Sequence, residues 1–184
     1  MGRPATDKKD RLVAAAMRRF HHQGVVSSSL AAVAGDAGVP AGNVYYYFQS
    51  KDALAAAVID RWCNRAAAHL ERFDSPDKVQ RVRDFLISAA ERRQAYADFG
   101  CPLAALDRDL RPGAAATATG GGRPLGLIRD WLVVQLGCAA KADFCLSGLQ
   151  GSFTLAHATG DPSVIARTVD QLLQWIDSLP DPAP

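Results

Sequence analysis

Residues 29–51, SLAAVAGDAGVPAGNVYYYFQSK, decide the fold, because they predict two short helices joined by a tight turn. The first helix has one apolar face, made of Leu30, Val33, Ala34 and Ala37. Gly38 then ends it, since glycine tolerates a positive φ. In the second helix Val44 and Phe48 are four residues apart and face the core, so that Asn43 and residues 45–47, three tyrosines, point outward. This layout is typical of a helix-turn-helix unit that reads DNA.

A third predicted helix precedes this pair and completes the unit. Its apolar stripe consists of Leu12, Val13, Ala16, Met17 and Phe20, and the helix ends at Gln23-Gly24. Through Lys51 the chain has seven basic and three acidic residues, a local charge of +4, whereas the whole chain has a charge of +2. The remaining residues, fourteen basic and sixteen acidic, carry a charge of −2. A basic head on a slightly acidic body indicates that the head binds phosphate groups.

Residues 10–54, DRLVAAAMRRFHHQGVVSSSLAAVAGDAGVPAGNVYYYFQSKDAL, closely resemble the amino-terminal domain of the TetR family of bacterial transcriptional repressors. The resemblance covers roughly the first third of the chain. It rests on the Phe20 to Gly24 spacing, the Ala37-Gly38-Val39 turn, and Tyr45, Phe48 and Lys51. The sequence departs from the family at Pro40, where a hydroxyl residue usually caps the recognition helix. The resemblance implies a homodimer that binds a palindromic operator and releases it when a small-molecule effector binds.

The resemblance and the side-chain chemistry together predict the DNA-binding residues. Asn43 is the expected base reader, because its amide can donate and accept on a base edge. Gly42 allows a close backbone approach, and Tyr45 and Tyr46 can touch phosphate or a thymine methyl group. Tyr47 and Lys51 are expected to hold the DNA backbone, together with Ser29, the cap of the first helix. Tyr45 has an equal alternative as a ring at the edge of the core, and non-specific steering is assigned to Arg3, Lys8, Lys9 and Arg11.

The rest of the chain predicts an all-α body, which divides the protein into a DNA-binding domain at 1–50 and a ligand-binding and dimerisation domain at 51–184. A long helix is expected from Lys51 or Asp52 to about Arg72, with Leu54, Val58, Trp62 and Ala66 on one face. Ser75 and Pro76 are the expected cap and first residue of the next helix, and Gly100 closes that region. Residues 112–124, PGAAATATGGGRP, predict a connection that tolerates mutation.

The last two predicted helices, at about 142–158 and 162–179, have a pattern suited to an interface. The first is apolar nearly all round, and the second has a single apolar stripe, so the pair can form half of a four-helix interface across a two-fold axis. The resemblance supports this interpretation, since TetR-like proteins dimerise through their final two long helices; the alternative is that both helices are simply core. The predicted interface residues are Cys145, Gly148, Leu149, Ser152, Val169, Leu172 and Ile176.

Large apolar residues between the head and these helices are candidates for an effector pocket. They are Trp62, Tyr96, Phe99, Cys101, Leu103, Leu106, Leu127, Trp131, Phe144 and Phe153. Each of them can also be an ordinary core residue. Cys101 is singled out because it is expected to cap the helix that begins at Pro102, where the helix dipole would lower its pKa. Gly100-Cys101-Pro102 resembles a subset of TetR-like regulators, some of which sense oxidants or electrophiles; the alternative is a cysteine that packs as a small hydrophobe.

Other classes of function have less support in the sequence. Cys101 with His157 is the one thiol and imidazole pair considered for an enzyme, but nothing visibly orients the histidine, so no catalytic residue is predicted. A helical binding or scaffold protein with a vestigial head is a further alternative. The four cysteines lack the paired spacing of a zinc site, and no metal or cofactor is expected. No apolar run reaches membrane-spanning length and no secretory signal is recognised, so a cytoplasmic protein is expected.

Overall fold

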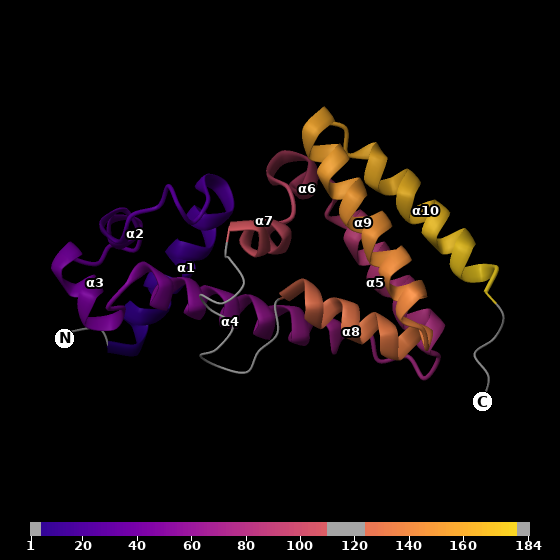
Figure 1. Cartoon of the computed structure of the whole chain (residues 1–184), viewed down its shortest axis with the longest axis horizontal. Coiled ribbons are helices and arrows are strands. Elements are labelled where there is room, and N and C mark those ends of the chain that lie inside the picture. Colours follow the sequence, from indigo (N-terminus) through magenta and orange to yellow (C-terminus); the bar gives the residue numbers. More distant parts are fainter. Residues whose placement is uncertain (1–4, 110–123, 180–184) are drawn as a thin grey trace. The chain divides into compact units, whose positions relative to one another are not determined.

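The computed structural model describes residues 5–109 and 124–179, and these form ten α-helices (Figure 1). The first four are α1 (Ala5–Gln23), α2 (Leu30–Asp36), α3 (Ala41–Tyr47) and α4 (Lys51–Leu70). They are followed by α5 (Lys78–Glu91), α6 (Arg93–Phe99), α7 (Pro102–Asp109), α8 (Pro124–Leu136), α9 (Ala139–Thr159) and α10 (Ser163–Asp177). The predicted all-α fold is confirmed. Within the described residues no helix is both long and apolar enough to span a bilayer.

The described residues fall into two compact units. The first contains residues 5–65 and 103–109 with Pro124, and the second contains 66–102 and 125–179. Helix α4 therefore contributes its first fifteen residues, up to Arg65, to the first unit and the remainder to the second. The predicted division into residues 1–50 and 51–184 is one of function and remains a prediction. The predicted connection at 112–124 lies outside the described residues except for Pro124, which begins α8.

The first unit is built around the core that the sequence predicts. Leu12 of α1, Val33 of α2, Val44 of α3 and Leu54 of α4 are all buried in one cluster. The turns between these helices depend on glycine: Gly24 has φ 80° after α1 and Gly38 has φ 61° after α2. A side chain with a Cβ would be strained at either position. Burying one side of each helix leaves the opposite side of α3 facing solvent.

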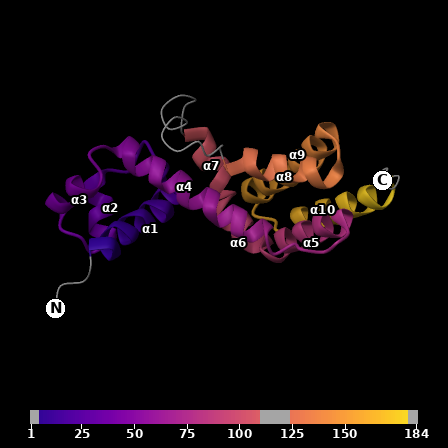
Figure 2. The same ribbon diagram turned by 90° about the horizontal axis from the view of Figure 1, so that it is seen from below.

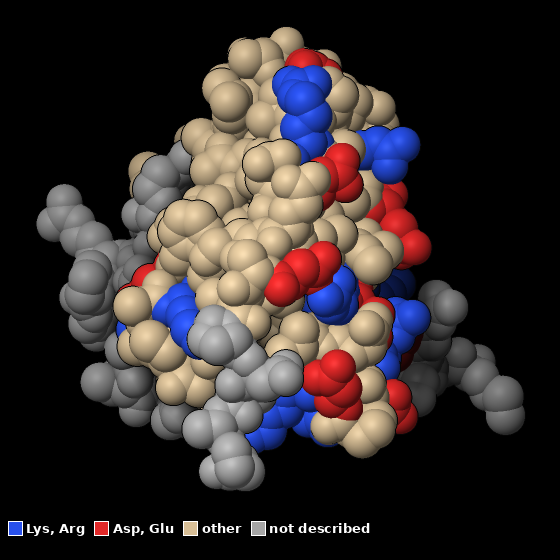
Figure 3. Space-filling view, turned by 90° about the vertical axis from the view of Figure 1, so that its right-hand side faces the viewer, with Lys and Arg blue, Asp and Glu red and all other residues tan. Residues whose placement is uncertain are grey.

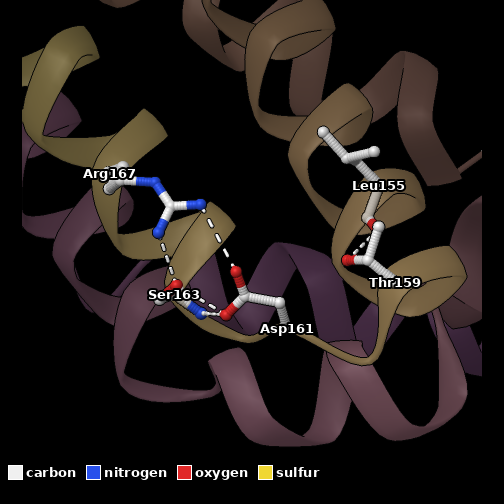
Figure 4. Close-up of polar contacts among 5 residues, drawn as sticks. All are labelled: Leu155, Thr159, Asp161, Ser163 and Arg167. Carbon is white, nitrogen blue, oxygen red and sulfur yellow. Dashed lines mark hydrogen bonds and ion pairs between the residues drawn. The ribbon is translucent and has the colours of Figure 1, made fainter.

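The second unit packs α9 against α10 and α6, and α10 against α5 (Figure 2). Gly148 of α9 allows a close approach to α10, because a Cβ built on it would lie 3.4 Å from Cδ2 of Leu172. Gly160, with φ 67°, ends α9. At the start of α10 the Asp161 carboxylate accepts a 2.9 Å hydrogen bond from the backbone N–H of Ser163 (Figure 4). Arg167 also donates to Asp161, across 3.4 Å, which fixes the turn between the two helices.

The start of α5 differs from the prediction. Asp77 caps this helix by accepting a 2.8 Å hydrogen bond from the backbone N–H of Val79, so Ser75 and Pro76 lie before the helix. Ser75 supports the turn instead, since its hydroxyl accepts from the Asp77 N–H and its carbonyl accepts from Arg81. The region that was expected to run on to Gly100 is also interrupted at Arg92, between α5 and α6.

The predicted interface residues lie mostly in the core of their own unit, and their role in a dimer remains a prediction. All except Gly148 are buried within this single chain: Cys145, Leu149, Ser152, Val169, Leu172 and Ile176. They form the contact of α9 and α10 with the rest of their own unit, so these side chains have no free area to offer a partner. The apolar stripe in each helix was recognised correctly, but it covers the core of the chain itself.

Candidate nucleic-acid interface

Helices α2 and α3 form the predicted helix-turn-helix pair. The Ser29 hydroxyl accepts a 3.1 Å hydrogen bond from the backbone N–H of Ala32, which confirms Ser29 as the cap of α2. Pro40 occupies the cap position of α3 and makes no side-chain hydrogen bond there. Proline therefore precedes the first helical residue, Ala41, and the N–H groups of the first turn of α3 lack the hydroxyl cap that the family usually provides.

The outward side of α3 presents small, polar and aromatic groups together. Ala41, Gly42 and Asn43 are exposed at its start, and Tyr45 and Tyr46 expose 61% and 82% of their surface. The exposed ring of Tyr45 excludes the alternative in which only its hydroxyl reaches solvent. Tyr47 differs from the prediction, since it is half-buried, packs against the core and contacts the Tyr46 ring edge-on with the ring centroids 5.0 Å apart. Its neighbours on the helix are therefore better placed to reach a base edge.

Ion pairs neutralise the acidic side chains of the head. Asp7 lies 3.8 Å from Arg11, Asp36 lies 2.5 Å from Arg19, and Asp10 pairs with Arg61 of α4. The basic surplus of this part of the chain then comes from other side chains, which include Lys8, Lys9 and Arg18. Arg3, which was also assigned a steering role, lies outside the described residues.

Two of the predicted DNA-binding cations also hydrogen-bond within the head. Lys51 donates from its ammonium to the Val26 carbonyl across 3.0 Å, and Arg11 donates to the Gly38 carbonyl across 3.5 Å. Lys9 lies over the Phe48 ring, 5.8 Å from its centroid. The sequence did not predict these contacts, because they join residues that are 25 or more positions apart.

The loop before α2 adds two exposed residues to this surface that the sequence analysis did not single out. Val26 exposes 78% of its surface, and the neighbouring Ser27 is also exposed. Val25 takes the buried position instead. Ser50 was also missed: its hydroxyl accepts a 3.1 Å hydrogen bond from the Ala53 N–H and caps α4. The serine that directly precedes the expected start of that helix was the available signal.

The predicted pocket residues are divided between the two units. Trp62 and Leu106 pack on the core of the first unit, to which Leu103 also belongs. In the second unit Tyr96 stacks on Phe153 with ring centroids 3.9 Å apart, and Phe144 contacts Trp175 with centroids 4.7 Å apart. Trp131 packs in a different group, with Phe73 and Phe85. Phe99 is half-exposed and Leu127 is partly buried. The pocket therefore remains a prediction.

The cysteines differ strongly in their surroundings. Cys101 is partly buried. Burial raises the pKa of Tyr96, and the charge of Cys101 raises it further. Cys138, which the sequence analysis did not single out, occupies the cap position of α9. The backbone N–H groups of Lys141 and Ala140 lower its pKa. Burial raises the pKa of Cys145 to about 12.

The head is a basic three-helix unit in which α3 follows a glycine turn and has one exposed side. These features are those of a helix-turn-helix DNA-binding protein. Residues 12–58 match the family of bacterial regulatory proteins of the tetR type. An uncharacterised helix-turn-helix transcriptional regulator encoded in the lacX 3′ region of Lactococcus lactis subsp. lactis is 26% identical over 181 residues, covering 89% of this chain and 90% of that protein. Residues 12–58 therefore form the helix-turn-helix domain of a TetR family transcriptional regulator.

The fold of the whole chain matches solved members of this family. A TetR family regulator from Agrobacterium tumefaciens has a TM-score of 0.79 at 18% identity, with 92% of this chain and 97% of that chain covered. A TetR regulator from Legionella pneumophila has a TM-score of 0.77 at 20% identity, covering 95% of this chain and 99% of that one. These structures extend the likeness in fold beyond the head to the helical body.

Proposed function

We propose that this protein is a homodimeric repressor that binds a palindromic operator through α3 and releases it when a small-molecule effector binds the body. The observation that carries the proposal is the exposed side of α3, where Gly42, Asn43, Tyr45 and Tyr46 face solvent on a basic head. A free amide beside a glycine on a helix that can enter the major groove suits the reading of adenine.

The other predicted contacts have distinct roles in this proposal. Asn43 reads a base edge, and Gly42 lets the backbone of α3 come close to the DNA. Tyr45 and Tyr46 contact phosphate or a thymine methyl group, and the Tyr47 hydroxyl reaches phosphate from a ring held by the core. Ser29 and Lys51 can both contact phosphate while keeping their internal hydrogen bonds, because a hydroxyl and an ammonium each have donors to spare.

The dimer would use a different face of α9 and α10 from the one predicted. One row of exposed residues on α9 repeats at spacings of three and four and carries no charge: Ala140, Phe144, Ser147, Gly151, Thr154 and Ala158. Asp143, which is exposed and pairs with Arg129, is not part of this row. Phe144, which is 55% exposed, touches Trp175 of α10. On α10 the uncharged residues Val164, Thr168 and Gln171 precede Trp175 at the same spacing of three and four. We call this set the α9–α10 face. Figure 3, which looks onto the right-hand side of Figure 1, shows uncharged residues over much of its upper and left part, with most charged side chains toward the right and the bottom.

Two such faces can pack as a four-helix interface across a two-fold axis. Gly151 is exposed and a Cβ built on it would meet nothing within 4 Å of the chain, so a second α9 can approach closely there. The polar group of Asp161, Ser163 and Arg167 lies at the turn that joins the two helices (Figure 4), where it would form part of a solvated rim.

The effector would bind among the aromatic side chains of the second unit, and α4 would carry its effect, because this helix belongs to both units. The ligand must prefer the state in which the two heads no longer match successive major grooves, since equal affinity for both states would shift nothing. Cys101 is a second candidate input, favoured by its partial exposure. An oxidant or electrophile would then replace the small-molecule effector.

Binding to the DNA upstream of the gene tests the proposal. We expect sequence-selective, salt-sensitive binding to one fragment, with an inverted repeat protected from cleavage and half-sites about 34 to 36 Å apart. Catalytic turnover, or tight binding of a small molecule with no DNA binding at any salt concentration, would contradict it and favour the scaffold or enzyme alternatives.

A further inference from the structure

The two ends of α2 are each approached by a basic side chain from another helix. Before α2, the Val26 carbonyl accepts a 3.0 Å hydrogen bond from Lys51, the first residue of α4. After α2, the Gly38 carbonyl accepts a 3.5 Å hydrogen bond from Arg11 of α1. All of these residues lie in the first unit. The sequence-based reading assigns both cations to DNA alone, and the proposed function does not use the internal contacts.

The segment before α2 needs such a support because few of its backbone groups bond locally. The Ser28 hydroxyl donates to the Gly24 carbonyl across 2.8 Å, and the Ser28 N–H donates to Val25 across 3.3 Å. Val25 is buried, whereas Val26 and Ser27 project into solvent. The Lys51 ammonium thus holds the carbonyl of an exposed residue in a loop whose buried residues are Val25 and Ser28.

The contact between Lys51 and Val26 joins two elements that are far apart in the sequence. The Ser50 cap fixes the first turn of α4, and Lys51 reaches from that turn across 25 residues of sequence to the loop that leads into α2. The loop that leads into the helix-turn-helix pair, which lies between residues 30 and 47, is therefore bonded to the first residue of the next helix, α4. At the other end, Arg11 has its charge balanced by Asp7, so its bond to Gly38 needs no DNA to be formed.

We infer that Lys51 and Arg11 are positioning residues that clamp the two ends of α2, and that Lys51 ties the start of α4 to the loop before α2. A displacement of α4 then moves Ser29 and the phosphate-contacting start of α2 together with it. This inference rests on the proposed DNA-binding function for its purpose, but the clamp itself exists in the protein without DNA. It also limits how far the two side chains can be counted as charges available to DNA.

The test uses the full-length protein without DNA and follows backbone amide signals and hydrogen exchange by NMR. In Lys51→Met we expect the signals of residues 26–29 to move and the Ala32 and Val33 amides to exchange about two- to tenfold faster, as for the loss of one exposed hydrogen bond. Lys51→Arg, which keeps a donor, should stay close to the wild type. Lys8→Met removes an equal charge from α1 and is the matched control, expected to leave these signals in place.

The second end of the clamp is tested in the same way. Arg11→Met should accelerate exchange at Val39, whose N–H donates to Ala34 beside the Gly38 turn, and leave residues 26–29 unchanged. If Lys51→Met matches Lys8→Met in the loop, and only lowers the salt dependence of binding to random duplex DNA by about one phosphate, Lys51 is a phosphate contact alone and the inference is overturned. Failure to bind any DNA with an intact clamp would instead remove the proposed function and leave the clamp standing.

Discussion

Arg92 lies over the ring of His69, with its Nη2 atom 3.2 Å from Nδ1 and 3.0 Å from Nε2. A donor nearly equidistant from both ring nitrogens stacks on the imidazole and does not align with a single lone pair. The Ser88 hydroxyl lies 3.2 Å from Nε2 and itself donates to the Phe85 carbonyl. A neutral imidazole with its proton on Nε2 can donate to the Ser88 hydroxyl and leaves Nδ1 unprotonated beside the Arg92 guanidinium. The pair joins the end of α4 to the junction of α5 and α6.

This contact predicts that acid destabilises the second unit. Burial, then the charges of Arg92 and Arg72, lower the pKa of His69 below its usual 6.5. The unfolded chain therefore binds the proton more readily than the folded one, so the contribution of His69 is complete above about pH 6.5 and is lost as the pH falls through its lowered pKa. Chemical denaturation at several pH values should show this loss, and His69→Gln should flatten the curve. His22→Gln, at an exposed histidine of α1, is the control and should not.

Asn43→Ala tests the base-reading role. We expect a loss of about 1 to 3 kcal/mol in binding free energy on the operator with nearly unchanged binding to random DNA, because an amide on a base edge discriminates sequence without adding charge. Fluorescence anisotropy on both duplexes at one salt concentration measures it. Gln49→Ala removes an exposed amide just beyond α3 and serves as the control. Equal losses on the two duplexes would remove Asn43 from base reading.

Substitutions at Gly148 and Gly151 of α9 test folding and dimerisation separately. Gly148→Leu adds a side chain where Leu172 already lies 3.4 Å from the new Cβ, and overpacking of this kind costs about 1 to 3 kcal/mol of stability. Gly151→Leu meets nothing within 4 Å of its Cβ in the chain and replaces a glycine in a helix interior, so the fold of the single chain should tolerate it.

The α9–α10 face predicts opposite results for these two variants in solution. Light scattering should find Gly151→Leu as a monomer with intact helicity at micromolar concentration, whereas Gly148→Leu should lose thermal stability first. A wild-type protein that is already monomeric, or a Gly151→Leu protein that remains a dimer, would exclude this face as the interface.

The sequence predicted the head well because its information is local. Glycines with positive φ mark the turns. Leu12, Val33, Val44 and Leu54 each lie on the apolar face of their own helix, and the periodicity within each helix predicts that this face is buried. The side of α3 opposite Val44 then follows from geometry. The clamp on α2 could not be predicted in this way, because Lys51 and Val26 meet only through the tertiary fold.

The body was predicted less well because an apolar stripe does not reveal what covers it. Leu172 and Ile176 lie in a stripe as regular as any interface, yet they fill the core of their own unit. The exposed face of α9 is defined instead by uncharged small residues such as Ser147 and Gly151, which a search for large apolar side chains passes over. The candidate pocket residues belong to both units, and aromatic side chains of the second unit pack in separate pairs such as Tyr96 with Phe153 and Phe85 with Trp131, so the pocket remains a prediction.

The cap position of Cys138 could have been predicted from the glycine that precedes it. Gly137, with φ 67°, ends α8 as Gly100, with φ 71°, ends α6, and a cysteine follows each glycine immediately before a new helix. The same reasoning that singled out Cys101 therefore applies to Cys138. The difference is that the backbone N–H groups of Lys141 and Ala140 lower the pKa of the Cys138 thiol. The effect of modifying Cys101 must therefore be distinguished from the effect of modifying Cys138 before either thiol is assigned a sensing role.

Alkylation provides that separation and gives a final prediction. The thiolate is the reactive species, so iodoacetamide should label Cys138 at a lower pH than an ordinary cysteine requires and should spare Cys145, whose pKa burial raises to about 12. Peptide mass spectrometry measures both sites over time, and labelling of Cys145 in the folded protein would contradict its burial.

If Cys101 is the input of the regulator, loss of DNA binding should follow the labelling of Cys101 and not the earlier labelling of Cys138. Cys138→Ser should then respond like the wild type, whereas Cys101→Ser should keep its DNA after treatment; release that persists in Cys101→Ser and disappears in Cys138→Ser would transfer the sensing role to Cys138.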